Sequence, residues 1–356
     1  MIAPSPAEER ASSLAYIPSL NGLRALSICL VLLGHLSGTR HFTTVDLGIG
    51  DYPNLGVIVF FVISGFLITS LLNKEREKTG RVSLKLFYAR RALRIFPAAY
   101  LFIACTSLLW ASGLIHLHPA DLWHAVSYTV NYEAFRSWQV GHLWSLSVEE
   151  QFYLLWPCAY AFLGPRRAVW VAVGLLFLGP VARVADWIVF RRTPYYDLEM
   201  FPMLADSLAA GCLLASTRSW LERQNWYLRL FQPGYSVLLF GMMLLANRWL
   251  DYTPMRVLGM SFVNIALAVL IHRAVYRPHD WVGRILNWKP VAWVGVLSYS
   301  LYLWQQLFIN RNSTAWLNAF PQNLLLAVLT AVVSYFLLEK PLLKLRAQLR
   351  PVSHRR

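Results

Sequence analysis

Long apolar blocks recur along almost the whole chain and limit it to helices that cross a membrane. Each block approaches the 20 residues that a helix needs to span the hydrocarbon core of a bilayer. Hydrophobic residues make up 57% of the 356 residues, charged residues make up 14%, and the mean hydropathy is +0.44. The sequence therefore predicts an all-α fold, a polytopic membrane helical bundle of about ten transmembrane helices. The ten blocks are Leu20 to Ser37, Leu55 to Leu72, Pro97 to Ile115, Trp144 to Leu163, Ala168 to Phe190, Phe201 to Ser216, Phe231 to Asn247, Val257 to Ile271, Pro290 to Ile309 and Asn323 to Leu338.

Basic residues are distributed unevenly between the segments that separate these blocks. If the N-terminus is inside, 24 of the 33 Lys and Arg residues fall in inner segments and seven in outer segments. Basic loops stay on the cytoplasmic side, so both termini are predicted to be cytoplasmic. The net charge of +15 then reports orientation and gives no reason to expect nucleic acid as a partner. We expect a cytoplasmic N-terminal segment over residues 1–19, a transmembrane domain over residues 20–340 and a basic cytoplasmic tail over residues 341–356.

The cysteines give no sign of a metal or disulfide framework. They fall one each in four apolar blocks, and the chain has neither a C-x-x-C pair nor a histidine cluster at ligand spacing. We interpret them as small buried residues and predict no metal site. The four are Cys29, Cys105, Cys158 and Cys212.

The first apolar block carries two polar residues that lipid does not accommodate well, Arg24 and His35. Eleven residues make about three helical turns, so both side chains are expected on one helix face, about 16 Å apart along the axis. Ionisable groups inside a membrane cost free energy and usually mark a route for a proton, an ion or a substrate. This pair is the strongest functional signal in the sequence, although packing between helices also accounts for a lone histidine.

Small and cationic residues interrupt the next two blocks. Ser64 and Gly65 lie in the middle of the second block, where they allow close approach of another helix or of a ligand. Arg90, Arg91 and Arg94 come at the inner mouth of the third block. A guanidinium group binds two phosphate oxygens at once through two parallel hydrogen bonds, but a basic cluster at this position also sets topology and binds anionic lipid.

The fourth block begins with Trp144 and Ser145 and carries two adjacent carboxylates, Glu149 and Glu150. Adjacent residues on a helix point about 100° apart, so only one of the two is expected to face the centre of the bundle. Carboxylates near a helix N-terminus also interact favourably with the helix dipole, which by itself accounts for one of them.

Taken together, these motifs resemble the acyltransferase-3 family of integral membrane O-acyltransferases, which are glycan or lipopolysaccharide O-acetylase-like. The resemblance covers nearly the whole chain. The matching motifs are Arg24 with His35, Phe60 to Leu67, Arg90 to Pro97 and Trp144 to Tyr153, with looser matches at Asp206, at Tyr299 with Tyr302, and at Glu339 to Pro341. One departure is Gln305, at a position that is often histidine in the family.

The resemblance implies transfer of an acyl group, most simply acetyl, from cytoplasmic acyl-CoA to a hydroxyl of an extracytoplasmic or lipid-linked glycan. It also implies a multi-pass protein of the bacterial inner membrane. His35 is the expected base or nucleophile. Arg24 is expected to hold donor phosphates or to pair with Glu149, and Glu149 to orient His35 or pair with an arginine. Donor binding is assigned to Arg90, Arg91, Arg94, Ser64 and Gly65, and substrate contact or support to Trp144, Ser145, Asp206, Tyr299 and Tyr302.

Other interpretations stay open at this point. A transporter or flippase that uses Arg24, His35 and Glu149 as a proton or anion pathway suits the same polar residues on physical grounds. The aromatic residues of the outer loop from His116 to Leu143 either hold a sugar or belong to the interfacial belt. Arg183 and Asp186, three residues apart, are predicted to form a neutralising pair.

Overall fold

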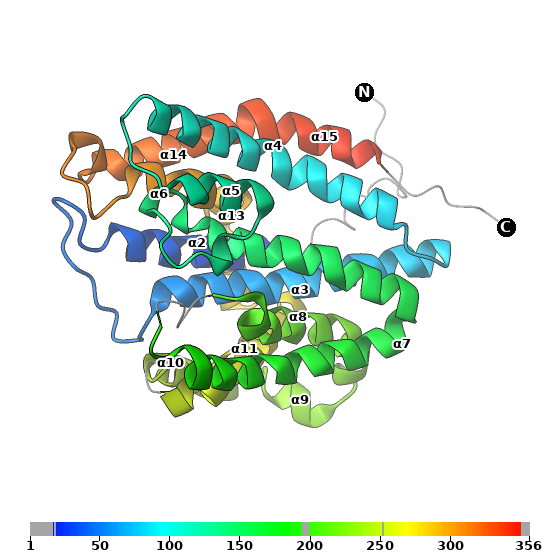
Figure 1. Cartoon of the computed structure of the whole chain (residues 1–356). Helices are drawn as coiled ribbons and strands as arrows, with labels where there is room; N and C mark the ends of the chain where they lie inside the picture. The colour runs from blue at the N-terminus through cyan, green and yellow to red at the C-terminus, as the bar shows by residue number, and fades with distance from the viewer. Residues whose placement is uncertain (1–16, 18, 194–198, 251–252, 350–356) are drawn as a thin grey trace.

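The computed structural model describes residues 17, 19–193, 199–250 and 253–349, and their regular structure is entirely helical (Figure 1). Three short turns of other helix types supplement the α-helices, at Val130–Tyr132, Trp316–Asn318 and Tyr335–Glu339. The α-helices are α2 (Leu20–Leu36), α3 (Tyr52–Thr79), α4 (Leu84–Ala111), α5 (Pro119–Ser127), α6 (Trp138–Gly141), α7 (Leu143–Phe190), α8 (Phe201–Leu221), α9 (Asn225–Arg229), α10 (Pro233–Arg248), α11 (Thr253–Tyr276), α12 (Trp281–Leu286), α13 (Lys289–Phe308), α14 (Gln322–Ser334) and α15 (Lys340–Gln348).

Several of these helices are long and apolar enough to cross a membrane. Among the described residues, five segments meet both conditions, and α2 is a shorter apolar helix. Together they define a multi-pass integral membrane protein. The count of ten spans and the cytoplasmic placement of the termini stay predictions. The five segments are Tyr52–Thr79, Leu84–Ala111, Trp138–Phe190, Arg256–Tyr276 and Gln322–Gln348.

Helix α7 comprises two predicted blocks joined at a kink. Gly164 has φ 78° and ψ 166°, a conformation that is almost confined to glycine. Pro165 follows it and starts the second half with a φ angle already suited to a helix. The kink therefore falls between the blocks that the sequence predicts, Trp144 to Leu163 and Ala168 to Phe190.

Glycines bring the helix backbones into contact where the bundle is tightest. A Cβ atom added at Gly65 would overlap the backbone of Leu208, and one added at Gly211 would overlap that of Val62, so α3 and α8 meet backbone to backbone. Gly295 packs against Asn21 in the same way and joins α13 to α2. Close approach through small residues is the usual means of packing helices in a membrane.

The two ends of the bundle differ in character (Figure 1). At the basic end lie the α3–α4 turn, the kink at Gly164 and the C-terminal turn of α15. At the loop end lie two long irregular connections, residues 37–51 and residues 309–321. Residues 341–348, the start of the segment predicted to be a basic tail, lie in α15 (Lys340–Gln348), which packs against α4.

The cysteine interpretation is right for one residue and wrong for another. All four cysteines are free thiols; Cys212 is buried, whereas Cys29 is exposed on the surface of α2. Apolar blocks of a membrane bundle have an outer face, so a cysteine in such a block need not be buried. Among the described residues, no group of three or more His, Cys, Asp or Glu side chains is placed to hold a metal ion.

Candidate functional site

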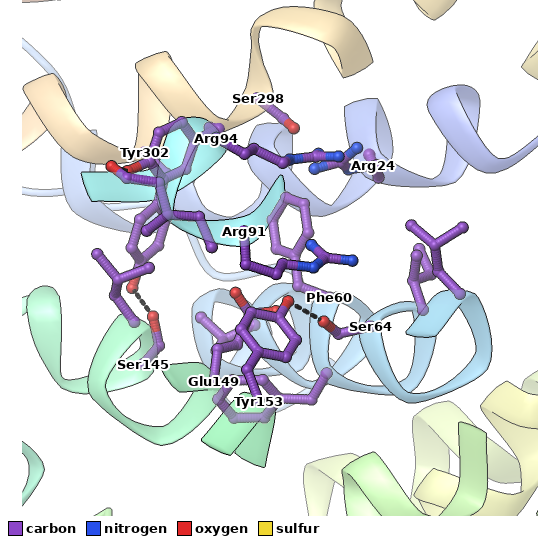
Figure 2. Close-up of a pocket in the computed structure, with 17 residues that line it drawn as sticks. Arg24, Phe60, Ser64, Arg91, Arg94, Ser145, Glu149, Tyr153, Ser298 and Tyr302 are labelled. Carbon is purple, nitrogen blue, oxygen red and sulfur yellow. Dashed lines mark hydrogen bonds between the residues drawn. The ribbon is translucent and has the colours of Figure 1, made fainter. Parts of the chain in front are cut away.

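Five helices surround a cavity of about 80 Å³ near the middle of the bundle (Figure 2). Arg24 comes from α2, Ser64 from α3, Arg91 and Arg94 from α4, and Glu149 from α7. Helix α13 closes the remaining side. The other polar or aromatic side chains of the lining are Phe60, Phe61, Ser145, Tyr153, Ser298, Tyr299 and Tyr302.

The cavity contains more positive than negative charge. Three guanidinium groups, those of Arg24, Arg91 and Arg94, line it together with one carboxylate, that of Glu149. Arg91 is only 8% exposed, and its Nη2 atom is buried without a hydrogen-bond partner. Its guanidinium lies over the ring of Tyr153, with 4.7 Å between Cζ and the ring centroid. A buried guanidinium group without a full set of acceptors is costly, so this arrangement favours an anionic ligand.

One face of α7 supplies the polar wall opposite the arginines. Ser145, Glu149 and Tyr153 are spaced four residues apart and therefore lie one above another on the same face. Tyr153 Oη lies 2.5 Å from Ser64 Oγ (Figure 2). Glu150 is turned away from this face, does not line the cavity, and has a buried Oε1 atom without a hydrogen-bond partner. Of the two adjacent carboxylates, Glu149 is thus the one that lines the cavity.

Helix α13 connects the cavity with the polar groups at the loop end. The hydroxyl of Tyr302 lies 2.5 Å from Ser145 Oγ and donates to the carbonyl oxygen of His142 at 2.8 Å. Tyr299 donates to the carbonyl oxygen of Ile95 at 2.8 Å. Trp144 does not line the cavity, and its ring packs edge to face against Phe61.

His35 lies beyond the cavity, in the last turn of α2, and is half-buried. Its Nδ1 atom is 2.9 Å from Oε1 of Gln305 on α13. Its ring meets the ring of Trp138 at nearly a right angle, with 5.5 Å between centroids. Arg311 stacks on the same Trp138 ring and donates to the carbonyl oxygen of Gly34 at 3.0 Å. Arg24 and His35 thus both approach α13, one at the cavity and the other about three turns further along α2.

His142 is a second histidine at this site, and the sequence analysis did not single it out. It precedes α7, is 2% exposed, and places Nδ1 2.8 Å from Oε1 of Gln306 and Nε2 3.0 Å from the carbonyl oxygen of Leu303. Its ring also packs against Tyr302. Two adjacent glutamines in an apolar helix, Gln305 and Gln306, were the available signal, since buried amides need partners.

The basic cluster divides into paired and unpaired arginines. Arg90 is bonded to Glu75, with Nη2 2.6 Å from Oε2, and does not line the cavity. Arg91 and Arg94 line it, and among the described residues neither has an ion pair. Arg346 of α15 interacts electrostatically with all three of these arginines. This fourth guanidinium is another residue that the sequence analysis missed, because its position depends on how α15 packs.

Asp206 belongs to a separate, buried ion pair. It is 0% exposed and lies 2.8 Å from Arg183, which also donates to the carbonyl oxygen of Met203 at 2.6 Å. Ser261 donates to the same carboxylate at 2.7 Å. The predicted pair of Arg183 with Asp186 is therefore wrong: the guanidinium reaches across to α8 instead of along its own helix, and Asp186 keeps a buried oxygen without a partner.

Gly65 lies at the contact between α3 and α8 and does not line the cavity.

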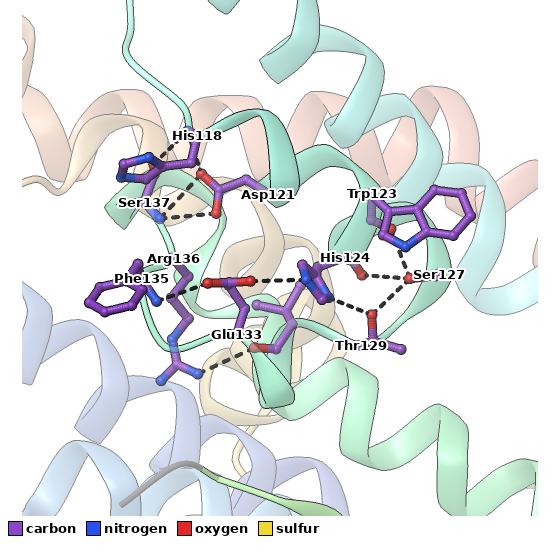
Figure 3. Close-up of polar contacts among 11 residues, drawn as sticks. His118, Asp121, Trp123, His124, Ser127, Thr129, Glu133, Phe135, Arg136 and Ser137 are labelled. Carbon is purple, nitrogen blue, oxygen red and sulfur yellow. Dashed lines mark hydrogen bonds and ion pairs between the residues drawn. The ribbon is translucent and has the colours of Figure 1, made fainter. Parts of the chain in front are cut away.

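The loop from His116 to Leu143 is held in shape by its own polar contacts (Figure 3). Asp121 is 1% exposed and accepts from the backbone N–H groups of His118 and Ser137, at 2.8 Å and 3.2 Å. His124 lies 2.9 Å from Glu133. These contacts set the position of Trp138, the ring that His35 touches, whereas Trp123 is 71% exposed.

Comparison with known proteins assigns the family. Residues 17–339 match the acyltransferase-3 model, described as an acyltransferase domain, and the chain belongs to this family. It is 28% identical over 359 residues to peptidoglycan O-acetyltransferase OatA of Listeria monocytogenes, an alignment that covers 91% of this chain and 54% of that protein. It is 29% identical over 365 residues to the putative peptidoglycan O-acetyltransferase YrhL of Bacillus subtilis, with coverage of 92% and 55%.

A third relative is O-acetyltransferase OatA of Staphylococcus aureus, which is 29% identical over 369 residues, with coverage of 94% of this chain and 58% of that protein. The chain thus spans little more than half the length of these relatives. No solved structure matches it.

Proposed function

We propose that this protein is a membrane O-acetyltransferase that moves an acetyl group from cytoplasmic acetyl-CoA to a hydroxyl group of a glycan on the outer side of a bacterial cytoplasmic membrane. The observation that carries the proposal is the cavity lined by three guanidinium groups and one carboxylate. Family membership and the printed names of the relatives give the reaction class. The cell-wall glycan named for those relatives is the acceptor class proposed here.

The donor fits the cavity through its charge. Coenzyme A carries several phosphate groups, and guanidinium groups pair well with phosphate oxygens. Arg91 offers an unpartnered buried Nη2 atom, and Arg94 lies beside it in the cavity wall. The cavity is small, so it holds only the part of the donor next to the nucleotide. Arg346, which interacts electrostatically with this cluster, extends the positive field toward the basic end.

The transfer itself is assigned to His35, about 16 Å along α2 from Arg24. The pantetheine arm of the donor would cover this separation and bring the thioester to the histidine. His35 takes the proton of the acceptor hydroxyl, the oxygen bonds to the thioester carbonyl carbon, and the C–S bond breaks. The imidazolium then returns the proton to the leaving thiolate, so the products are the ester and free coenzyme A.

Arg24 and Glu149 have supporting roles in this proposal. Arg24 lines the cavity on the α2 side, where its guanidinium can bind a donor phosphate or balance the charge of Glu149. Glu149 also lies beside the Ser64–Tyr153 hydrogen bond (Figure 2), so its carboxylate limits how many anionic groups the arginines can hold. With both residues lining the cavity, the site keeps its charge partly balanced when the donor is absent.

The test is transfer of radiolabelled acetyl from acetyl-CoA to glycan in membrane vesicles. We compare the wild type with His35→Ala, and use His279→Ala as the control because His279 is exposed and does not line the cavity. The proposal predicts label in the wild type and the control and a loss of at least about 100-fold in His35→Ala, the usual contribution of a general base. Equal labelling in all three would remove His35 from the reaction. Movement of glycan across the membrane without any acyl donor would favour the transporter instead.

A further inference from the structure

Two adjacent glutamines of α13 each hold one histidine of another segment. Gln305 is 0% exposed and its Oε1 atom lies 2.9 Å from His35 Nδ1, while Gln306 is 4% exposed and its Oε1 atom lies 2.8 Å from His142 Nδ1. The Nε2 atom of Gln305 is buried without a partner. An unsatisfied buried amide group costs roughly 1–3 kcal/mol, so packing alone does not favour glutamine over an apolar residue here.

The contact with Gln305 decides which nitrogen of His35 is free. A neutral imidazole has one N–H donor and one nitrogen with a lone pair. When the amide oxygen of Gln305 accepts from Nδ1–H, the proton stays on Nδ1 and Nε2 keeps its lone pair. The same logic operates wherever a third group orients a catalytic histidine.

The other neighbours of His35 hold the ring without competing for this proton. Trp138 of α6 packs against it edge to face. Arg311, from the loop after α13, and His142, before α7, interact with His35 electrostatically, and both are donors or potential cations. Among the described residues, Gln305 is the one side chain that forms a hydrogen bond with this imidazole, and no carboxylate forms an ion pair with it.

We propose that Gln305 is a positioning residue: its amide oxygen accepts from Nδ1–H of His35 and so leaves Nε2 as the basic nitrogen that faces the acceptor hydroxyl. This inference rests on the proposed function, in which His35 is the base. It gives a role to the residue at which the sequence departs from the histidine often found in the family. A neutral amide fixes the tautomer without adding the negative charge that a carboxylate would bring beside the ring.

The test compares three variants in the acetyl-transfer assay, each with kcat and KM measured across pH. Gln305→Leu removes the acceptor, and kcat should fall about 10- to 100-fold with KM for the donor unchanged, as when an orienting partner of a functional histidine is lost. Gln305→Glu keeps an acceptor but cannot donate, so it should retain transfer, with the acid limb of the pH profile moved to higher pH because the carboxylate stabilises the imidazolium. Gln306→Leu, the matched variant on the same helix, should lose stability but keep the wild-type pH profile.

The outcomes separate the inference from the proposed function. An unchanged kcat in Gln305→Leu would overturn the positioning role, and so would a Gln305→Glu variant as impaired as Gln305→Leu, since the amide would then have to donate. Thermal unfolding of each purified variant shows whether a loss of transfer reflects loss of fold; a folded Gln305→Leu is required for the kcat comparison, and Gln305→Asn, which keeps the amide but shortens it, replaces it otherwise. If His35→Ala still transfers acetyl, it is the proposed function that fails.

Discussion

Two regions of this bundle, the Arg183–Asp206 pair and the cavity, place arginines in apolar helices, and they differ in how far the protein balances the positive charge. Arg183 is surrounded by acceptors: Asp206 at 2.8 Å, the carbonyl oxygen of Met203 at 2.6 Å and that of Val257 at 3.0 Å. Among the described residues, the arginines that line the cavity have no such set of acceptors. Arg91 is almost as buried as Arg183, yet its Nη2 atom has no partner.

The difference distinguishes an arginine whose charge the protein balances from one that is available to bind a ligand. A buried guanidinium group must have its charge balanced and its N–H groups bonded, or it costs several kcal/mol. At Arg183 the fold balances the charge with Asp206 and bonds both terminal nitrogens, so that only Nε of this guanidinium has no partner. At the cavity the fold leaves Arg91 Nη2 without a hydrogen-bond partner, so an anion of suitable shape can supply the missing acceptor and the balancing charge.

The largest expected effect on stability comes from breaking the ion pair between Arg183 and Asp206. Asp206→Asn leaves Arg183 as an uncompensated buried charge and should destabilise the fold by about 3–5 kcal/mol, the usual cost of removing one partner of a buried ion pair. The measurement is thermal unfolding in detergent, with Asp186→Asn as control. A melting temperature equal to that of the wild type would contradict the structural role of the pair.

The reverse result is expected at the cavity. Arg91→Gln removes a charge that the protein does not balance, so stability should be unchanged or improved, while the KM for acetyl-CoA rises at least about tenfold, because hydrogen bonds to charged groups contribute about 1.5–3 kcal/mol. Steady-state kinetics together with unfolding scans check both parts. A destabilised Arg91→Gln with unchanged KM would show that the two arginine regions do not differ as argued.

A smaller effect should follow at the connection between the cavity and His142. Tyr302→Phe removes the hydrogen bonds to Ser145 Oγ and to the carbonyl oxygen of His142. With each hydrogen bond contributing about 1 kcal/mol, stability should fall modestly and kcat should drop less than in His35→Ala. Ser145→Ala serves as comparison, since it removes only one of the two bonds. A Tyr302→Phe protein that loses transfer completely would make the hydroxyl part of the chemistry.

The smallest effect is expected at the basic end, where water screens the charge. Arg346→Gln should raise the KM for acetyl-CoA about two- to fivefold at low salt, and the difference should vanish at high salt. Lys344→Gln is the matched control, because Lys344 is exposed on the same helix two residues away and so points to another side. Equal shifts in both variants would indicate a general attraction of anions or lipid headgroups.

Periodicity within one helix could be predicted from the sequence, and pairing between helices could not. The spacing of Arg24 and His35 predicted one shared helix face, and in the structure Arg24 lines the cavity that α13 closes while His35 contacts Gln305 of α13; the four-residue spacing in α7 separates Glu149 from Glu150. By contrast, the partner of Arg183 lies on another helix at Asp206, where a three-residue spacing pointed to Asp186. Such pairs depend on which helix faces are packed together, and that information is not local.

The same limit explains the residues that were missed or moved. His142 and Arg346 join the site only through packing, by the approach of α13 to α7 and of α15 to α4. Gly65 lies in a motif that also suits ligand binding, but the backbone of Leu208 occupies the space that a side chain would fill. A small residue in a membrane helix is compatible with either helix packing or ligand binding, and only its neighbours in the structure show which role it has.

The most direct test of the central claim, that the unbalanced arginines bind the anionic donor, is calorimetric titration of coenzyme A into the purified protein in lipid nanodiscs. The account predicts saturable binding to the wild type, weaker by about tenfold or more in Arg91→Gln and in Arg94→Gln, and unchanged in His35→Ala, which lies beyond the cavity. Binding that is absent from the wild type, or that is as strong in both arginine variants as in the wild type, would contradict it.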